Sequence, residues 1–248
     1  MKNVNVMLVH GAWADGSCWS KVILLLNAKG YNVTAAQIPL TSLSDDIAVT
    51  RRLLSSQTAP TVLVGHSYGG AVITGAATAT PQVKALVYIT AFALDEGESL
   101  ASLSSQGPPS PGSTAIEPDA SGFLWISREK FHQAFVADAT DDEADVMSIV
   151  QKPLSVASFT EKEGTPAWKT IPSWYLVCTE DQMIPPPAQQ FLAQRMNATV
   201  RTVAASHAAF MAKAQAVADI IALAAESVSE AHAPQDTLRQ ATKTLVEA

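Results

Sequence analysis

TVLVGHSYGGAVITGAAT, residues 61–78, is the stretch that decides the fold. Its apolar start predicts a buried strand, and AVITGAAT predicts a helix. Between them, Gly65-His66-Ser67-Tyr68-Gly69 has the spacing GxSxG, in which small flanking residues permit a sharp turn that lifts the serine hydroxyl clear of the sheet. Ser67 is therefore a candidate nucleophile. The alternatives are a glycine-rich turn that only packs closely, or a phosphate-binding loop, although the sequence Gly-Lys-Ser/Thr is missing here.

On both sides of this stretch, short β-rich runs alternate with helix-length segments, which is typical of an α/β fold with a parallel sheet. Runs such as TVLVG and ALVYIT are apolar throughout, as expected for strands that helices cover on each side. The predicted strands are residues 4–9, 31–38, 61–64, 83–89, 174–178 and 199–203. The predicted helices are residues 17–29, 43–56, 68–78, 186–196 and 212–227.

Residues 94–169 interrupt this alternation, and a stretch of this length without a core strand is too long for a simple connection. It starts with SLSSQGPPSPGSTAIEPDASG, a loop by composition. SREKFHQAFVADA and DDEADVMSIVQ, which follow, are expected to be helical. The predicted organisation is a core of residues 1–93 and 170–228, an insertion of residues 94–169, and a C-terminal extension of residues 229–248.

Composition predicts a single soluble domain, since the chain has 248 residues, 48% of them hydrophobic, and a net charge of −7. The insertion contains 13 acidic and 5 basic residues, so all of the net negative charge comes from it. Without a basic excess, nucleic acid and anionic membranes are not expected as partners. No apolar stretch reaches the roughly 20 residues that cross a bilayer. Two cysteines with no disulfide or CxxC pattern predict free thiols, and we expect a cytoplasmic monomer or homodimer.

A serine nucleophile needs a base, and the base needs a carboxylate that fixes its tautomer. His207 lies just after the last predicted strand, where the carboxyl end of a parallel strand meets a ligand. Asp181 follows the preceding strand and is the preferred carboxylate, with Glu180 as the alternative. The chain order is then serine, acid, histidine. His10 and His66 are expected to be structural.

Acyl transfer also requires hydrogen-bond donors for a developing oxyanion. The backbone N–H of Tyr68, directly after the serine, is one candidate. The second is the Ala12 N–H, because Gly11 permits a tight turn after the first strand. Candidate substrate-pocket residues are Trp13, Tyr68, Phe92, Phe123, Trp125, Met183 and Phe210.

Four motifs resemble the α/β-hydrolase superfamily, in particular its small branch of plant methylesterases, hydroxynitrile lyases and bacterial esterases. They are LVHGAW, LVGHSYGG, VCTEDQMIP and SHAAFM, in this order. The resemblance implies a six-stranded, mostly parallel sheet with helices on both faces, and a helical cap at residues 94–169. It implies Ser67, Asp181 and His207 as the triad and Ala12 and Tyr68 as oxyanion donors, with no cofactor or metal.

The departures from this branch favour hydrolysis over cyanohydrin cleavage. The lyases have a threonine where this chain has Gly11, and a lysine where it has Ala208. The predicted function is hydrolysis of a small-molecule carboxylic ester through an acyl-enzyme. Alternatives are lactonase, amidase, C–C hydrolase or hydroxynitrile lyase-like chemistry on the same fold, or a non-catalytic ligand receptor. The acidic insertion predicts that neutral or cationic esters react faster than anionic ones.

Overall fold

A computed structural model describes residues 2–231 and shows a six-stranded sheet in the order β2-β1-β3-β4-β8-β9. Every strand pairing in this sheet is parallel, which confirms the predicted α/β fold; the sheet was expected to be mostly parallel and is parallel throughout. All six predicted strands form. They are β1 (Asn5–Val9), β2 (Asn32–Ala35), β3 (Thr61–Ser67), β4 (Val83–Ala91), β8 (Ser173–Cys178) and β9 (Thr199–Val203).

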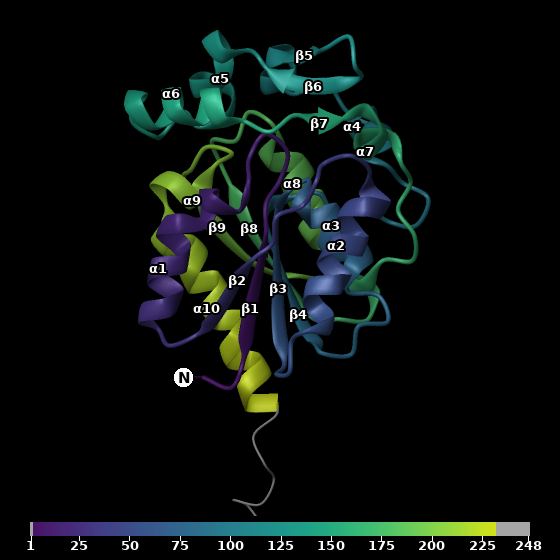
Figure 1. The fold of residues 1–248 in the computed structure, drawn as a ribbon, viewed down its shortest axis with the longest axis vertical. Helices are drawn as coiled ribbons and strands as arrows, with labels where there is room; N and C mark the ends of the chain where they lie inside the picture. The colour runs from purple at the N-terminus through teal and green to yellow at the C-terminus, as the bar shows by residue number, and fades with distance from the viewer. Residues whose placement is uncertain (1, 232–248) are drawn as a thin grey trace, which may run out of the picture.

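Helices cover both faces of the sheet (Figure 1). On one face α10 packs against β3, β4, β8 and α1; on the other, α3 packs against β1, β3, β4 and α2. The elements are η1 (Gly16–Trp19), α1 (Ser20–Ala28), α2 (Leu43–Ser55), α3 (Gly69–Ala76), α8 (Pro186–Arg195), α9 (Ala209–Ala212) and α10 (Ala214–Ala231). No helix within residues 2–231 is long and apolar enough to cross a membrane.

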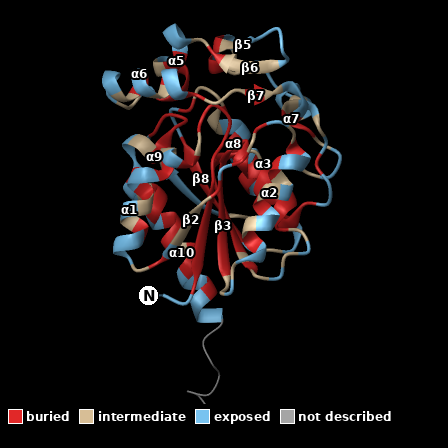
Figure 2. Cartoon of the chain, in the orientation of Figure 1, coloured by how far each residue is buried: buried red, intermediate tan, exposed pale blue. Residues whose placement is uncertain are grey.

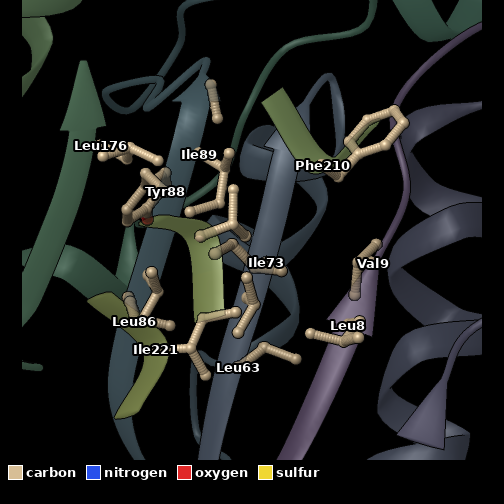
Figure 3. Close-up of a cluster of buried hydrophobic side chains, with 14 of the residues drawn as sticks. Leu8, Val9, Leu63, Ile73, Leu86, Tyr88, Ile89, Leu176, Phe210 and Ile221 are labelled. Carbon is tan, nitrogen blue, oxygen red and sulfur yellow. The ribbon is translucent and has the colours of Figure 1, made fainter. Parts of the chain in front are cut away.

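The core lies between the sheet and these helices. All residues of β3 are buried, whereas the exposed residues of the helices lie on their outer sides (Figure 2). Leu63, Ile73, Leu86 and Ile221 belong to one cluster of buried side chains (Figure 3). The prediction of strands that are apolar on both faces is thus confirmed for the centre of the sheet. Cys18 and Cys178 are free thiols, as expected.

Between β4 and β8 the chain forms a smaller assembly above the carboxyl ends of the strands (Figure 1). We call residues 92–172 the β4–β8 segment. Its two predicted helices are confirmed as α5 and α6, whereas the loop predicted from composition is wrong in part, because its residues 102–122 include the end of a helix, a 3-10 turn and a strand. The elements are α4 (Leu100–Ser104), η2 (Pro111–Ala115), β5 (Ile116–Pro118), β6 (Phe123–Ile126), α5 (Arg128–Phe135), α6 (Asp141–Val150), β7 (Leu154–Ser155), α7 (Val156–Thr160) and η3 (Ala167–Lys169).

The order of the strands determines where a site can form. From β1 the chain first moves to β2 at one edge, and then returns to β3 on the other side of β1. In open parallel sheets, ligands bind outside the carboxyl ends of the strands at such a reversal. β1 and β3 end here at Val9 and Ser67, so the two loops predicted to carry the site meet at this point.

Candidate active site

Ser67 occupies a strained turn at the junction of β3 and α3. Its φ of 52° lies in the left-handed region, which costs energy for a residue other than glycine. The turn is also tight, because a Cβ on Gly65 would lie 2.5 Å from the Gly69 carbonyl oxygen. Glycine at both ends of GxSxG therefore permits the close approach that points the Ser67 side chain out of the sheet.

His207 lies between Ser67 and Asp181. Its Nε2 is 2.9 Å from Ser67 Oγ and its Nδ1 is 2.7 Å from Asp181 Oδ2. Ser67, Asp181 and His207 are 4%, 2% and 0% exposed, so these hydrogen bonds are shielded from bulk water. A base in contact with a hydroxyl, held in turn by a carboxylate, is the arrangement that activates a serine nucleophile. Glu180, the alternative carboxylate, is exposed and lies outside this chain of hydrogen bonds.

The backbone N–H groups of Ala12 and Tyr68 have no hydrogen-bond partner within residues 2–231. Gly11 packs directly against the turn that carries Ser67, because a Cβ on Gly11 would lie 2.8 Å from the Cβ of Ser67. The next N–H, that of Trp13, donates to the Lys152 carbonyl at 3.0 Å, so it is already occupied. The two predicted donors are therefore available beside Ser67 for an oxyanion.

A cavity of about 760 Å³ opens above Ser67. Of the predicted pocket residues, Trp13, Tyr68, Phe92 and Met183 line it, together with Ala12. The remaining wall comes mainly from α4 and the following loop, and from α8. Residues that the sequence analysis missed include Leu103, Phe159, Ile184, Pro187 and Phe191.

Three predicted pocket residues do not line this cavity. Phe210 is 0% exposed, and its ring lies 4.9 Å from the His66 ring within the core (Figure 3). Phe123 and Trp125 are half-buried on β6, and the Trp125 indole N–H donates to the exposed Asp119 carboxylate at 2.9 Å. The prediction was wrong here because aromatic residues near a site pack wherever the fold has room, which local sequence does not specify.

The profile of the alpha/beta hydrolase family matches residues 6–220. The chain belongs to this family. Methylesterase 2 of Arabidopsis thaliana is 25% identical, over 86% of this chain and 92% of the relative. The carbendazim hydrolyzing esterase of Nocardioides sp. is 32% identical over 40% of this chain, and the match spans only 46% of that protein. A pyrethroid hydrolase structure from Sphingobium faniae has a TM-score of 0.80 at 24% identity, covering 92% and 99% of the two chains. The expected resemblance to the small esterase branch is confirmed.

Four groups besides His207 donate hydrogen bonds to the Asp181 carboxylate. Asp181 Oδ1 accepts the backbone N–H groups of Met183 and Ile184 at 2.7 and 3.0 Å. Asp181 Oδ2 accepts the hydroxyl of Thr90, and Gln189 Nε2 at 3.3 Å. Sequence analysis missed Thr90 and Gln189, since neither lies near Asp181 in a recognisable motif.

Two further histidines of this alpha/beta hydrolase are structural, as expected. Burial lowers the pKa of His66 well below its usual range, and its Nε2 donates to the His207 carbonyl at 2.8 Å. Burial lowers the pKa of His10 to about 4; its Nδ1 donates to the Gly11 carbonyl, and its Nε2 accepts the Ile38 N–H. Both are therefore neutral rings that hold loops beside Ser67.

Proposed function

We propose that this alpha/beta hydrolase is a serine-type carboxylic ester hydrolase that acts through an acyl-enzyme. The observation that carries the proposal is the hydrogen-bonded series Ser67–His207–Asp181 at the base of a cavity. The names of the relatives, an esterase, a methylesterase and a pyrethroid hydrolase, agree with ester cleavage.

In the first half of the reaction, His207 Nε2 accepts the Ser67 proton while Oγ attacks the ester carbonyl carbon. Asp181 stabilises the imidazolium that forms. The Ala12 and Tyr68 N–H groups bind the oxyanion, and each such donor contributes on the order of 3 kcal/mol to the transition state. His207 then donates its proton to the leaving alcohol.

In the second half, His207 accepts a proton from water, which attacks the acyl group on Ser67. The same two N–H groups bind the second oxyanion. The carboxylic acid leaves when His207 returns the proton to Ser67 Oγ. The protein's own groups thus supply every proton transfer of the proposed cycle.

The cavity favours an ester without formal charge. None of the described residues that line it is Asp, Glu, Lys, Arg or His. Moving a charged group from water into such a cavity has a large desolvation cost that no partner here offsets. We therefore revise the expectation that cationic esters react well, and propose that esters of either charge react more slowly than neutral ones of equal size.

We further propose that residues 94–169 act as a cap on the core formed by residues 1–93 and 170–228. This agrees with the contribution of α4 and Phe159 to the cavity wall. The extension at residues 229–248 lies outside the described chain except for the end of α10. A cytoplasmic location and a monomeric or homodimeric state stay predictions.

A panel of neutral, anionic and cationic p-nitrophenyl esters tests this function, with lactones, amides and cyanohydrins for comparison. Ser67→Ala and His207→Ala should lower kcat at least about a thousandfold. Both should also abolish labelling by a fluorophosphonate. Ser227→Ala is the matched control, because Ser227 is an exposed residue of α10 that does not line the cavity. Absence of ester turnover by the wild type would refute the proposal, and a folded protein that cannot be labelled would favour a ligand receptor.

A further inference from the structure

The loop that carries His207 has no regular secondary structure, and hydrogen bonds from three parts of the chain fix it. Residues 204–206 follow β9, and α9 begins only at Ala209. The Ala205 carbonyl accepts the Glu180 N–H at 3.1 Å, and the His207 carbonyl accepts the His66 Nε2–H. These bonds come from the core of the fold.

The other bonds to this loop come from the β4–β8 segment. Asp138, in the turn between α5 and α6, accepts the Ser206 backbone N–H at 3.1 Å and also the Ser206 hydroxyl. The Phe135 carbonyl accepts the Ala208 N–H at 3.1 Å. The Phe135 ring lies 5.1 Å from the His207 ring. Ser206 and Ala208, the residues on both sides of His207, are therefore hydrogen-bonded to one short part of this segment.

We propose that Asp138 is a positioning residue for His207 that acts through Ser206; this rests on the proposed function, in which His207 is the base. Ser206 is 2% exposed, so water cannot easily replace the carboxylate at its N–H and hydroxyl. Hydrogen bonds to an ionised carboxylate are about twice as strong as neutral ones. Two of them on the residue preceding His207 restrict the backbone from which the imidazole extends.

The need for such restriction follows from the geometry of the triad. His207 makes contacts of 2.9 Å and 2.7 Å on opposite sides of its ring, so a displacement of the loop that improves one weakens the other. A misplacement of about 1 Å at a reacting group can cost about a hundredfold in rate. A bond that holds the loop therefore affects the chemical step more than substrate binding.

The kinetic test compares Asp138→Ala, Asp138→Asn and the control Asp145→Asn. We expect Asp138→Ala to lower kcat for a neutral p-nitrophenyl ester by about 10- to 100-fold, with KM within about twofold of the wild type. Asp138→Asn should lose less, because its amide oxygen can accept the Ser206 N–H while its NH₂ group donates to the hydroxyl. Asp145 is an exposed residue of α6 without a side-chain hydrogen bond inside the described chain, so its variant should keep wild-type kcat.

A double variant tests whether Asp138 acts through Ser206. Ser206→Ala removes the hydrogen bond from the hydroxyl to Asp138 but keeps the one from the backbone N–H. In the Ser206→Ala background, Asp138→Ala therefore removes one hydrogen bond instead of two. The combined loss in kcat should therefore be smaller than the product of the two single losses. A fully multiplicative loss would show that Asp138 acts by another route.

A spectroscopic readout separates this proposal from ester hydrolysis itself. The His207 Nδ1 proton shared with Asp181 should give a downfield ¹H NMR resonance in the wild type, assigned by its loss in His207→Ala. Asp138→Ala should shift or broaden this resonance, whereas Asp145→Asn should not. If the wild type cleaves no ester, the proposed function fails but the resonance still tests Asp138. Wild-type kcat and an unchanged resonance in Asp138→Ala would overturn the proposal; if that variant does not fold, the same outcomes for Asp138→Asn decide.

Discussion

Glu163 provides a quantitative test of the electrostatics of this fold. It lies after α7, is 4% exposed, and forms no ion pair within residues 2–231. Its Oε1 accepts the Gly164 N–H at 3.2 Å, whereas its Oε2 has no hydrogen-bond partner among the described residues. Burial raises the pKa of Glu163 to about 8, although the Gly164 N–H and the charge of Arg51 act in the opposite direction.

Replacing this carboxyl group in Glu163→Gln keeps its shape and removes its ionisation. Between pH 4.5 and about 8 the unfolded wild type loses the proton that the folded state keeps, so wild-type stability falls as pH rises through this window. At about 1.4 kcal/mol per pH unit, the wild type loses at most about 5 kcal/mol of its free energy of unfolding across this window. Relaxation around the ionised group lowers it, and we expect the variant to be more stable than the wild type by about 2–4 kcal/mol at pH 8.

Urea unfolding of both proteins at pH 5, 6, 7, 8 and 9 measures this difference. It should be small at pH 5, grow up to pH 8 and then level off. Glu96→Gln is the control, because Glu96 is an exposed residue of the same segment, and its variant should track the wild type at every pH. A difference between Glu163→Gln and the wild type that is constant from pH 5 to pH 8, or that shrinks, would refute the assignment of Glu163 as a buried, protonated acid.

Three other perturbations follow from the same structure. Thr90→Val removes one hydroxyl donor from Asp181, and we expect a fall in kcat of about tenfold with unchanged KM, in steady-state assays; wild-type kcat would contradict this. His10 stays neutral down to about pH 4, so its NMR signals should not titrate at pH 6.5, and its burial should contribute up to about 3 kcal/mol of stability that is lost as pH falls from 6.5 to 4. Gly69→Ala puts a Cβ 2.6 Å from two backbone carbonyl oxygens and should lower Tm sharply, whereas Gly107→Ala, with open space, should not.

The sheet and the turn at Ser67 could be predicted because the patterns that indicate them involve residues close together in the sequence. The apolar run of residues 61–64 predicts a strand, and GxSxG between a strand and a helix permits few backbone paths. The positions of His207 and Asp181 beside Ser67 could be predicted because the carboxyl ends of parallel strands lie at the same edge of the sheet. The structure brings both to Ser67 for this reason.

The cavity wall could not be predicted in the same way. Phe210 follows His207 closely in sequence, yet its side chain packs in the core, while Phe191 on α8 reaches the cavity. Thr90 and Gln189 contact Asp181 only because β4 and α8 meet β8 in space. These contacts depend on tertiary packing, which no spacing along the chain encodes.

The composition suggested that the acidic residues of the β4–β8 segment create a negative electrostatic field over the substrate. The structure gives these residues a different role. None of them lines the cavity within the described chain. Several instead bind groups of the core: Glu98 binds Arg195, Asp138 binds Ser206, Glu143 binds Lys21, and Glu161 binds the Ser44 N–H. The exposed Glu143–Lys21 pair contributes about 0–1 kcal/mol, whereas the contacts of Glu98 with Arg195 and of Asp138 with Ser206 are more buried. Neutralising an acid such as Asp145, which binds no core group, should therefore leave the selectivity between charged and neutral esters unchanged.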